Sequence, residues 1–161
     1  MMVAFSTALP AQDVRRDYDH HVNFENFHTY SWQQVKANDP SVETRISGAV
    51  DRALIAKGLQ RVDANGDVTL AAVASLRRAT ELHASADGLL GGYWPGRFGN
   101  ESPTSARDSP METVVIDMYD AQNKHLIWRS MAEHSISADE QENEHNLTTL
   151  VDRMLKDFPA R

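Results

Sequence analysis

The sequence predicts an α+β fold: a two-layer sandwich in which two helices pack on one face of a mostly antiparallel sheet. Three observations predict it. Residues 112–136 alternate with period two, as expected for two strands joined by a short turn. Residues 39–58 and 137–158 each carry apolar side chains on one stripe at helical spacing. The predicted order is strand, strand, helix, four strands, helix.

The two strands at 112–136 predict a hairpin with two different faces. Opposite faces are expected to carry Val114, Ile116 and Met118 against Asp117 and Tyr119, and Leu126 and Trp128 against Ile127 and Arg129. We expect Trp128 in the core and Arg129 in an ion pair on the other face. The connection Asp120–Lys124 has turn chemistry: Asp120 can bond its own backbone, and Asn123 tolerates a left-handed conformation. Asp117 and Asp120 are interpreted as serving the turn rather than acid–base chemistry.

The first half of the chain supplies two short strands and a helix. Asp13–Asp19 is charged and alternating, which favours an edge strand, and Thr29–Trp32 is a second strand. Asp39 can cap a helix that Pro40 begins. Gly58 supplies a left-handed stop.

The middle of the chain predicts two further strands, and its end predicts a helix. Leu59–Asp63 and the segment from Asp67 onward are interpreted as strands separated by an Asn65-Gly66 turn. The alanine-rich stretch after Ala71 also fits a helix, but the preceding turn and the alternation favour a strand. Ser137–Glu140 has the spacing of a capping box for the last helix.

Composition narrows the function classes. The 161 residues carry a formal net charge of −7, which disfavours nucleic acid and anionic membrane surfaces as partners. The sequence has no cysteine, which excludes disulfides, thiolate metal sites and a cysteine nucleophile. No apolar run reaches the roughly 18 residues that a membrane-spanning helix needs.

The N-terminus has the composition of the end of an export signal. Met1–Ala11 is apolar or small, and Leu9-Pro10-Ala11 is a plausible cleavage site before Gln12. We therefore expect residues 1–12 to be a signal-peptide remnant or a disordered tail. Residues 13–161 are expected to form a single α+β domain with a flexible loop at 87–110.

The loop at 87–110 holds the candidate binding residues. Glycines stand at 88, 91, 92, 96 and 99, and an uninterrupted loop of this length is either functional or disordered. Apolar and aromatic residues there form the candidate partner-binding set: Leu89, Leu90, Tyr93, Trp94 and Phe98. The alternative is that they fold back onto the open sheet face as a lid.

No reactive centre is apparent from the sequence. The neighbouring His20 and His21 point to opposite faces of a strand, so they cannot easily share a metal. Glu142 and His145 share a helix face like half of a di-iron site, but the second half is missing. The glycine loop lacks the phosphate-binding pattern, and no nucleophile-elbow motif occurs. We expect no catalytic, cofactor-binding or metal-binding residues and no cofactor.

An ordered set of short motifs resembles one known family. The matching stretches are Val14–Asp19, Phe24–Trp32, Gly66–Leu70, Val115–Ala121, Leu126–Arg129 and Lys156–Pro159. Together they resemble DUF4136, a bacterial family of envelope lipoproteins with a domain of unknown function. The resemblance implies export and residence in the periplasm or at the outer membrane, and it implies no catalytic residues. The absence of cysteine favours a form without a lipid anchor.

Two functional hypotheses follow. The first is a non-catalytic envelope protein that binds another envelope component through the sheet face and the 87–110 loop. The second is a periplasmic hydrolase with a site under that loop. The oligomeric state is open. A pocket with two or more convergent buried ionisable groups would favour the enzyme.

Overall fold

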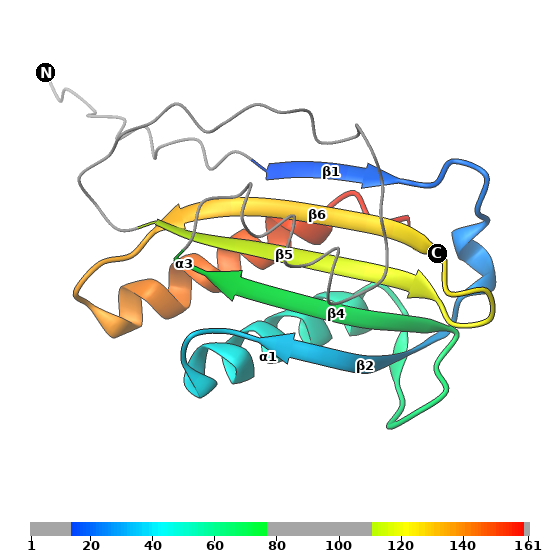
Figure 1. Ribbon diagram of the computed structural model, residues 1–161, viewed down its shortest axis with the longest axis horizontal. Helices are drawn as coiled ribbons and strands as arrows, with labels where there is room; N and C mark the ends of the chain where they lie inside the picture. The colour runs from blue at the N-terminus through cyan, green and yellow to red at the C-terminus, as the bar shows by residue number, and fades with distance from the viewer. Residues whose placement is uncertain (1–13, 77–110, 160–161) are drawn as a thin grey trace, which may run out of the picture.

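The computed structural model describes residues 14–76 and 111–159 (Figure 1). Its elements are β1 (Val14–Tyr18), η1 (Phe24–Asn26), β2 (Thr29–Lys36), α1 (Pro40–Ala56), β3 (Gln60–Arg61), β4 (Val68–Ser75), β5 (Met111–Asp120), β6 (Leu126–Ser135) and α3 (Glu140–Leu155). Apart from the short 3₁₀ turn η1, this is the predicted order of strands and helices.

The strands form one six-stranded sheet in the order β1-β6-β5-β4-β2-β3. The neighbouring pairs β1–β6, β6–β5 and β5–β4 are antiparallel, whereas β2 is parallel to both β4 and β3. β2 can run parallel to β4 because α1 lies between them in the chain and returns it to the same end of the sheet. The prediction of a mostly antiparallel sheet is confirmed.

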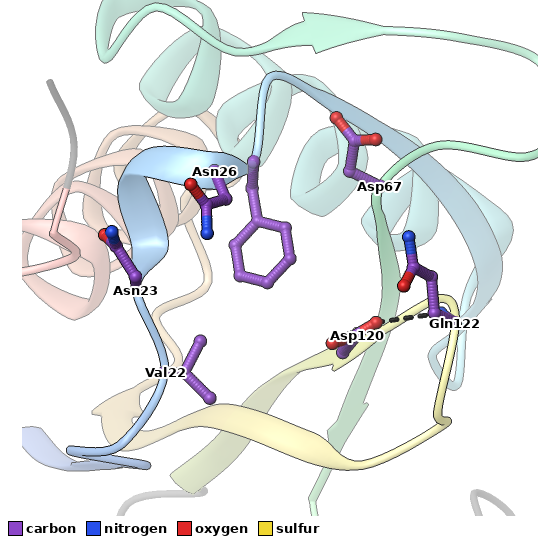
Figure 2. A pocket seen from close by; sticks show the side chains of 7 residues that line it. Val22, Asn23, Asn26, Asp67, Asp120 and Gln122 are labelled. Atoms are coloured by element: carbon purple, nitrogen blue, oxygen red, sulfur yellow. Dashed lines mark hydrogen bonds between the residues drawn. The ribbon is translucent and has the colours of Figure 1, made fainter.

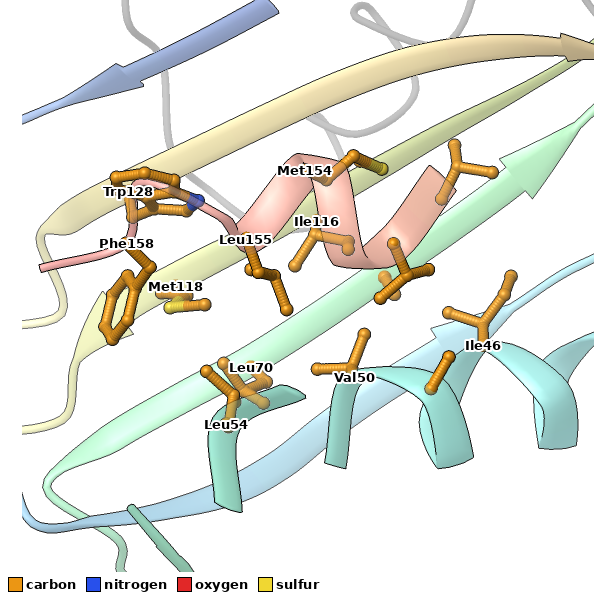
Figure 3. Packing of buried hydrophobic residues seen from close by; sticks show 14 of the residues in the cluster. Ile46, Val50, Leu54, Leu70, Ile116, Met118, Trp128, Met154, Leu155 and Phe158 are labelled. Atoms are coloured by element: carbon orange, nitrogen blue, oxygen red, sulfur yellow. The ribbon is translucent and has the colours of Figure 1, made fainter. Parts of the chain in front are cut away.

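Both helices lie on one face of the sheet, so the predicted two layers are confirmed (Figure 1). The core lies between these layers, where Ile46, Val50 and Leu54 of α1 are fully buried. Figure 3 shows the side chains of α1 and α3 meeting Leu70, Ile116 and Met118 of the sheet. Alternation on the strands and helical spacing on the helices thus bury one face of each element.

The hairpin β5–β6 departs from its predicted alternation at two residues, Leu126 and Ile127. Met118 pairs with Trp128 but Tyr119 pairs with Leu126, so β6 has one extra residue in a bulge. The extra residue, Ile127, is fully buried in the core together with Trp128. Strict alternation predicted that these two residues would lie on different faces of the strand. Alternation alone does not show a bulge, since the bulge moves Leu126 to the face of Tyr119 and Ile127 to the core face while the apolar pattern stays the same.

In the turn that joins β5 to β6, the predicted role of Asp120 is confirmed, whereas the prediction of a left-handed conformation at Asn123 is wrong. The Asp120 carboxylate accepts a hydrogen bond from the Gln122 backbone N–H at 2.8 Å. The left-handed residue is Lys124 (φ 62°), while Asn123 instead accepts from the His125 backbone N–H. Both side chains therefore stabilise the turn by bonding the backbone two residues ahead.

Both helices begin at a capping residue. The cap of α1 is the predicted one, and the cap of α3 lies two residues after the predicted one. Asp39 caps α1 by accepting from the Ser41 N–H at 2.7 Å, and Gly58 ends the helix region with φ 91°. In α3 the cap is Asp139, which accepts from the N–H groups of Gln141 and Glu142. Ser137, the predicted cap, lies two residues earlier and bonds Asp139, because the carboxylate is the stronger acceptor for the first-turn N–H groups.

Strand lengths differ from the predictions, while strand positions agree. β2 extends to Lys36 across a bulge between Trp32 and Gln34, and β3 is only two residues long. β4 is a strand at Val68–Ser75, as favoured over the helical alternative. Local alternation marks a strand, but its length depends on how far a neighbouring strand continues beside it.

Candidate functional site

A polar hollow opens at the end of the sheet where β5 turns into β6 (Figure 2). We use the name polar hollow for the depression of about 290 Å³ whose lining residues are Val22, Asn23, Asn26, Phe27, Asp67, Asp120 and Gln122. Three segments that are far apart in the sequence supply these residues: the η1 region, the start of β4 and the β5–β6 turn. Figure 2 shows Asn23 and Asn26 on one side of the polar hollow, and Asp67, Asp120 and Gln122 on the other.

The backbone of η1 places Asn23 and Asn26 on one side of the polar hollow. The Asn23 side chain caps this turn by accepting from the Glu25 N–H at 3.1 Å. Phe27 follows the turn, and its ring meets Phe24 edge-to-face at a centroid distance of 6.1 Å. Because Phe24 is buried in the core, this contact fixes the wall of the polar hollow to the rest of the molecule.

Asp67 forms the opposite wall and is held as a carboxylate. One of its oxygens accepts from the backbone N–H groups of His28 and Thr29, at 2.9 Å each. The hydrogen bond from the His28 backbone, followed by that from Thr29, lowers the pKa of Asp67 below its ordinary value. Asp67 is therefore ionised at neutral pH and is poorly suited to carry a proton in catalysis.

Asp120 and Gln122 complete the polar hollow from the β5–β6 turn. The Asp120 carboxylate is engaged by the Gln122 N–H, and the Ala121 N–H donates to the Asp67 carbonyl at 3.0 Å. These bonds join the turn to the start of β4. They leave the side-chain amides of Gln122 and Asn26 without a hydrogen bond in the part of the chain that the structure describes.

The polar hollow is therefore equipped for recognition. Two carboxylates give it negative charge, three amides offer both donors and acceptors, and Phe27 supplies an apolar surface. It contains no serine, threonine, cysteine, histidine or lysine that could act as a nucleophile or shuttle a proton. Within the described residues, no group of three or more histidine and acidic side chains is placed to hold a metal ion.

The predicted binding residues Leu89, Leu90, Tyr93, Trp94 and Phe98 lie outside the described residues. The histidine clusters that the sequence suggested are on the surface. His21 is almost fully exposed and contacts Asp19, and both Glu142 and His145 are exposed on α3. None of these histidine and acidic residues lines the polar hollow.

A buried ion pair and a buried contact between a histidine and a carboxylate lie on opposite faces of the β5–β6 hairpin. On the helix-free face, Arg129 donates to both oxygens of Asp117 at 2.7 Å, and both side chains are essentially inaccessible. This confirms the predicted ion pair of Arg129 and corrects the interpretation of Asp117 as a turn residue. On the helix side, His134 Nε2 lies 2.9 Å from a Glu112 oxygen.

Sequence reasoning missed the residues of the polar hollow and the His134–Glu112 pair. The polar hollow has no local motif, since its residues come together only through the β4–β5 pairing and the η1 turn. The sequence did contain one indication of this pair. Glu112 lies two residues before Val114, and His134 two residues after Ala132, so on alternating strands both side chains point to the core face. A charged residue on a core face indicates a buried partner.

The fold defines the chain as a two-layer α+β protein with both helices on one sheet face. Residues 14–160 match a family model described as a domain of unknown function, DUF4136, and the chain belongs to that family. The resemblance seen in the short motifs is thereby confirmed. A search of curated proteins finds no match.

Solved structures from several bacteria share the fold. A DUF4136 family protein of Bacteroides thetaiotaomicron has 15% identity and a TM-score of 0.60, covering 90% of this chain and 94% of that one. A PelC dodecamer from Paraburkholderia phytofirmans has 14% identity and a TM-score of 0.56, covering 93% and 98%. A PDZ domain protein from Parabacteroides distasonis has 14% identity and a TM-score of 0.60, but this chain covers only 35% of it.

Among the described residues, neither helix has the length and apolar character needed to cross a membrane.

Proposed function

We propose that this chain is an exported, non-catalytic protein of the bacterial cell envelope that binds another envelope component. The observation that carries the proposal is the state of the acids in the polar hollow. Backbone N–H groups engage Asp67 and Asp120, and those on Asp67 keep it ionised. A carboxylate with a lowered pKa, such as that of Asp67, recognises a ligand by charge and hydrogen bonding, whereas an acid–base catalyst needs a pKa near the working pH.

The chemistry of the polar hollow favours a partner group rich in N–H donors. Carboxylates accept hydrogen bonds, and the amides of Asn26 and Gln122 can accept or donate. The phenyl ring of Phe27 suits the apolar part of such a group, or a cation over its face. A lysine or arginine side chain on the surface of a partner protein has this combination of properties.

Export supports a site in the periplasm or at the outer membrane. The apolar stretch Met1–Ala11 resembles the end of a signal peptide, and the resemblance to a family of envelope lipoproteins implies the same location. The residues Leu89, Leu90, Tyr93, Trp94 and Phe98 are proposed as a second part of the binding surface. Since a PelC structure of the same fold is a dodecamer, a second copy of this chain is one partner to test.

A crosslinking pull-down from the native envelope tests the proposal. The double variant Asn26→Ala/Gln122→Ala removes the two free amides of the polar hollow and leaves the capping bonds of Asp67 and Asp120 in place. The matched control is Gln33→Ala/Gln141→Ala, which removes two exposed amides elsewhere. We expect the first variant to lose the crosslinked partner and the control to retain it, with circular dichroism unchanged in both.

Two further measurements separate the parts of the proposal. Deleting residues 88–99 should weaken the same crosslink if the loop is part of the binding surface. Light scattering after size-exclusion chromatography reports whether the partner is another copy. Equal capture by the amide variant and its control would overturn the role of the polar hollow, and turnover of an envelope polymer by the purified chain would overturn the non-catalytic assignment.

A further inference from the structure

Three buried polar atoms near the β1–β6 edge have no hydrogen-bond partner within the described residues. They are the indole Nε1 of Trp128, the hydroxyl Oγ of Ser130 and the Nε of Arg16. Trp128 and Ser130 are completely inaccessible to solvent. A buried donor or acceptor without a partner is costly and rare in folded proteins, so three of them together require an explanation.

Strand register brings the three residues together on the helix side of the sheet. Arg16 is directly opposite Ser130 in the β1–β6 pairing. Trp128 precedes Ser130 by two residues on the same strand, and their β5 partners Met118 and Ile116 both point into the core. Side chains with these relations share one face and lie within about 5–8 Å of each other.

The C-terminal segment closes over this cluster. The Arg16 guanidinium forms an ion pair with Asp157 through Nη1, which leaves its Nε on the inner side. Phe158 packs edge-to-face on Trp128 at 5.3 Å, and Tyr18 stacks on the indole at 5.7 Å. Figure 3 shows the indole nitrogen of Trp128 on the part of the ring that lies away from Phe158.

We infer that this cluster is a binding site for one internal water molecule. The indole N–H and the guanidinium Nε–H are donors only, and they match the two lone pairs of a water oxygen. The Ser130 hydroxyl can accept one of the hydrogens of that water. This arrangement supplies three hydrogen bonds, the typical number for a buried water, and it links β1, β6 and, through Arg16, the segment after α3.

Water-selective NMR on the ¹⁵N-labelled full chain tests the inference directly. We expect a cross-peak between the Trp128 indole N–H and a water molecule that resides for longer than nanoseconds. Trp32 provides an internal comparison, because its indole N–H donates directly to Asp51 at 2.9 Å. A crystal structure should show density within 3.2 Å of all three atoms. Absence of both the cross-peak and the density would overturn the inference.

A substitution at Ser130 gives an independent result. If a water bonds the hydroxyl, Ser130→Ala should lower the urea midpoint of unfolding and weaken the Trp128–water cross-peak. If the cluster is dry, removing an unsatisfied buried hydroxyl should leave the midpoint unchanged or raise it, which would contradict the inference. Ala132→Ser, on the same face of β6 and outside the cluster, controls for the effect of a hydroxyl at this face.

Discussion

Gly66 and Asp67 connect the polar hollow to the sheet at the scale of single residues. A Cβ on Gly66 would lie 2.5 Å from the Tyr30 carbonyl carbon and 2.6 Å from the Ser31 nitrogen, both backbone atoms. The preceding Asn65 takes the left-handed conformation of this turn (φ 58°). Glycine is thus needed here for close backbone contact between the turn and β2.

Gly66→Ala should therefore destabilise the protein by about 2–3 kcal/mol, since overpacking against fixed backbone is costly. Gly48, in the interior of α1, has no atom within 4 Å of its would-be Cβ. Gly48→Ala should stabilise by about 0.5–1 kcal/mol through helix propensity. Urea unfolding of the two variants measures both effects, and equal effects of the same sign would contradict the proposed contact.

Asp67 should make stability depend on pH. Its pKa is lowered in the folded state, so its contribution is present above the unfolded pKa of about 3.9 and is lost as pH falls through the folded pKa. We expect Asp67→Asn to cost about 1 kcal/mol at pH 7 and progressively less below pH 4. Thermal unfolding across pH 2–7 measures this, with the exposed Asp63→Asn as the comparison. A cost that stays constant with pH would exclude the carboxylate as its source.

Single polar side chains join whole elements to one another. Asp51 of α1 accepts hydrogen bonds from Tyr30 and Trp32 of β2 and from Arg61 of β3, at 2.6–2.9 Å. Burial, and then the hydrogen bond to Asp51, raises the pKa of the Tyr30 hydroxyl, which remains a donor. These bonds show that Asp51 faces the β2–β3 edge of the sheet.

The hairpin β5–β6 depends in the same way on the Asp117–Arg129 pair. Arg129→Met should cost about 3–5 kcal/mol, because it leaves the Asp117 carboxylate buried without its cation. The double variant Asp117→Leu/Arg129→Met should recover most of that loss, since it removes both buried charges. Denaturant unfolding of the single and double variants gives the coupling energy. A double variant less stable than either single variant would contradict this expectation. It would show that the pair contributes more to stability than the neutralisation of each buried charge by the other.

The C-terminal segment closes the molecule as a whole. Lys57, at the end of α1, donates to the carbonyl oxygens of Lys156 and Phe158, and Asp157 pairs with Arg16 of β1. The Phe158 ring packs against both Phe24 and Trp128. Residues from β1, η1, α1 and β6 thus meet at one short segment.

Phe158→Ala should lower the free energy of unfolding by about 3 kcal/mol, because it leaves a cavity beside two aromatic rings. It should also expose Trp128, which near-ultraviolet circular dichroism and fluorescence would report. The neighbouring exposed Lys156→Ala is the control. A loss of stability in Phe158→Ala with an unchanged Trp128 signal would show that the segment does not close over the β6 ring.

The sequence by itself determined the elements, their order and the layer to which most apolar residues belong. These properties depend on periodicity and caps, which are local and are visible as spacing between residues. Only the tertiary structure decided the bulge at Ile127, the parallel placement of β2 beside β4, the partners of Asp51 and Glu112, and the polar hollow. Each of these depends on which distant segments become neighbours. The spacing of apolar and polar residues within one segment does not indicate which other segment it pairs with across the sheet.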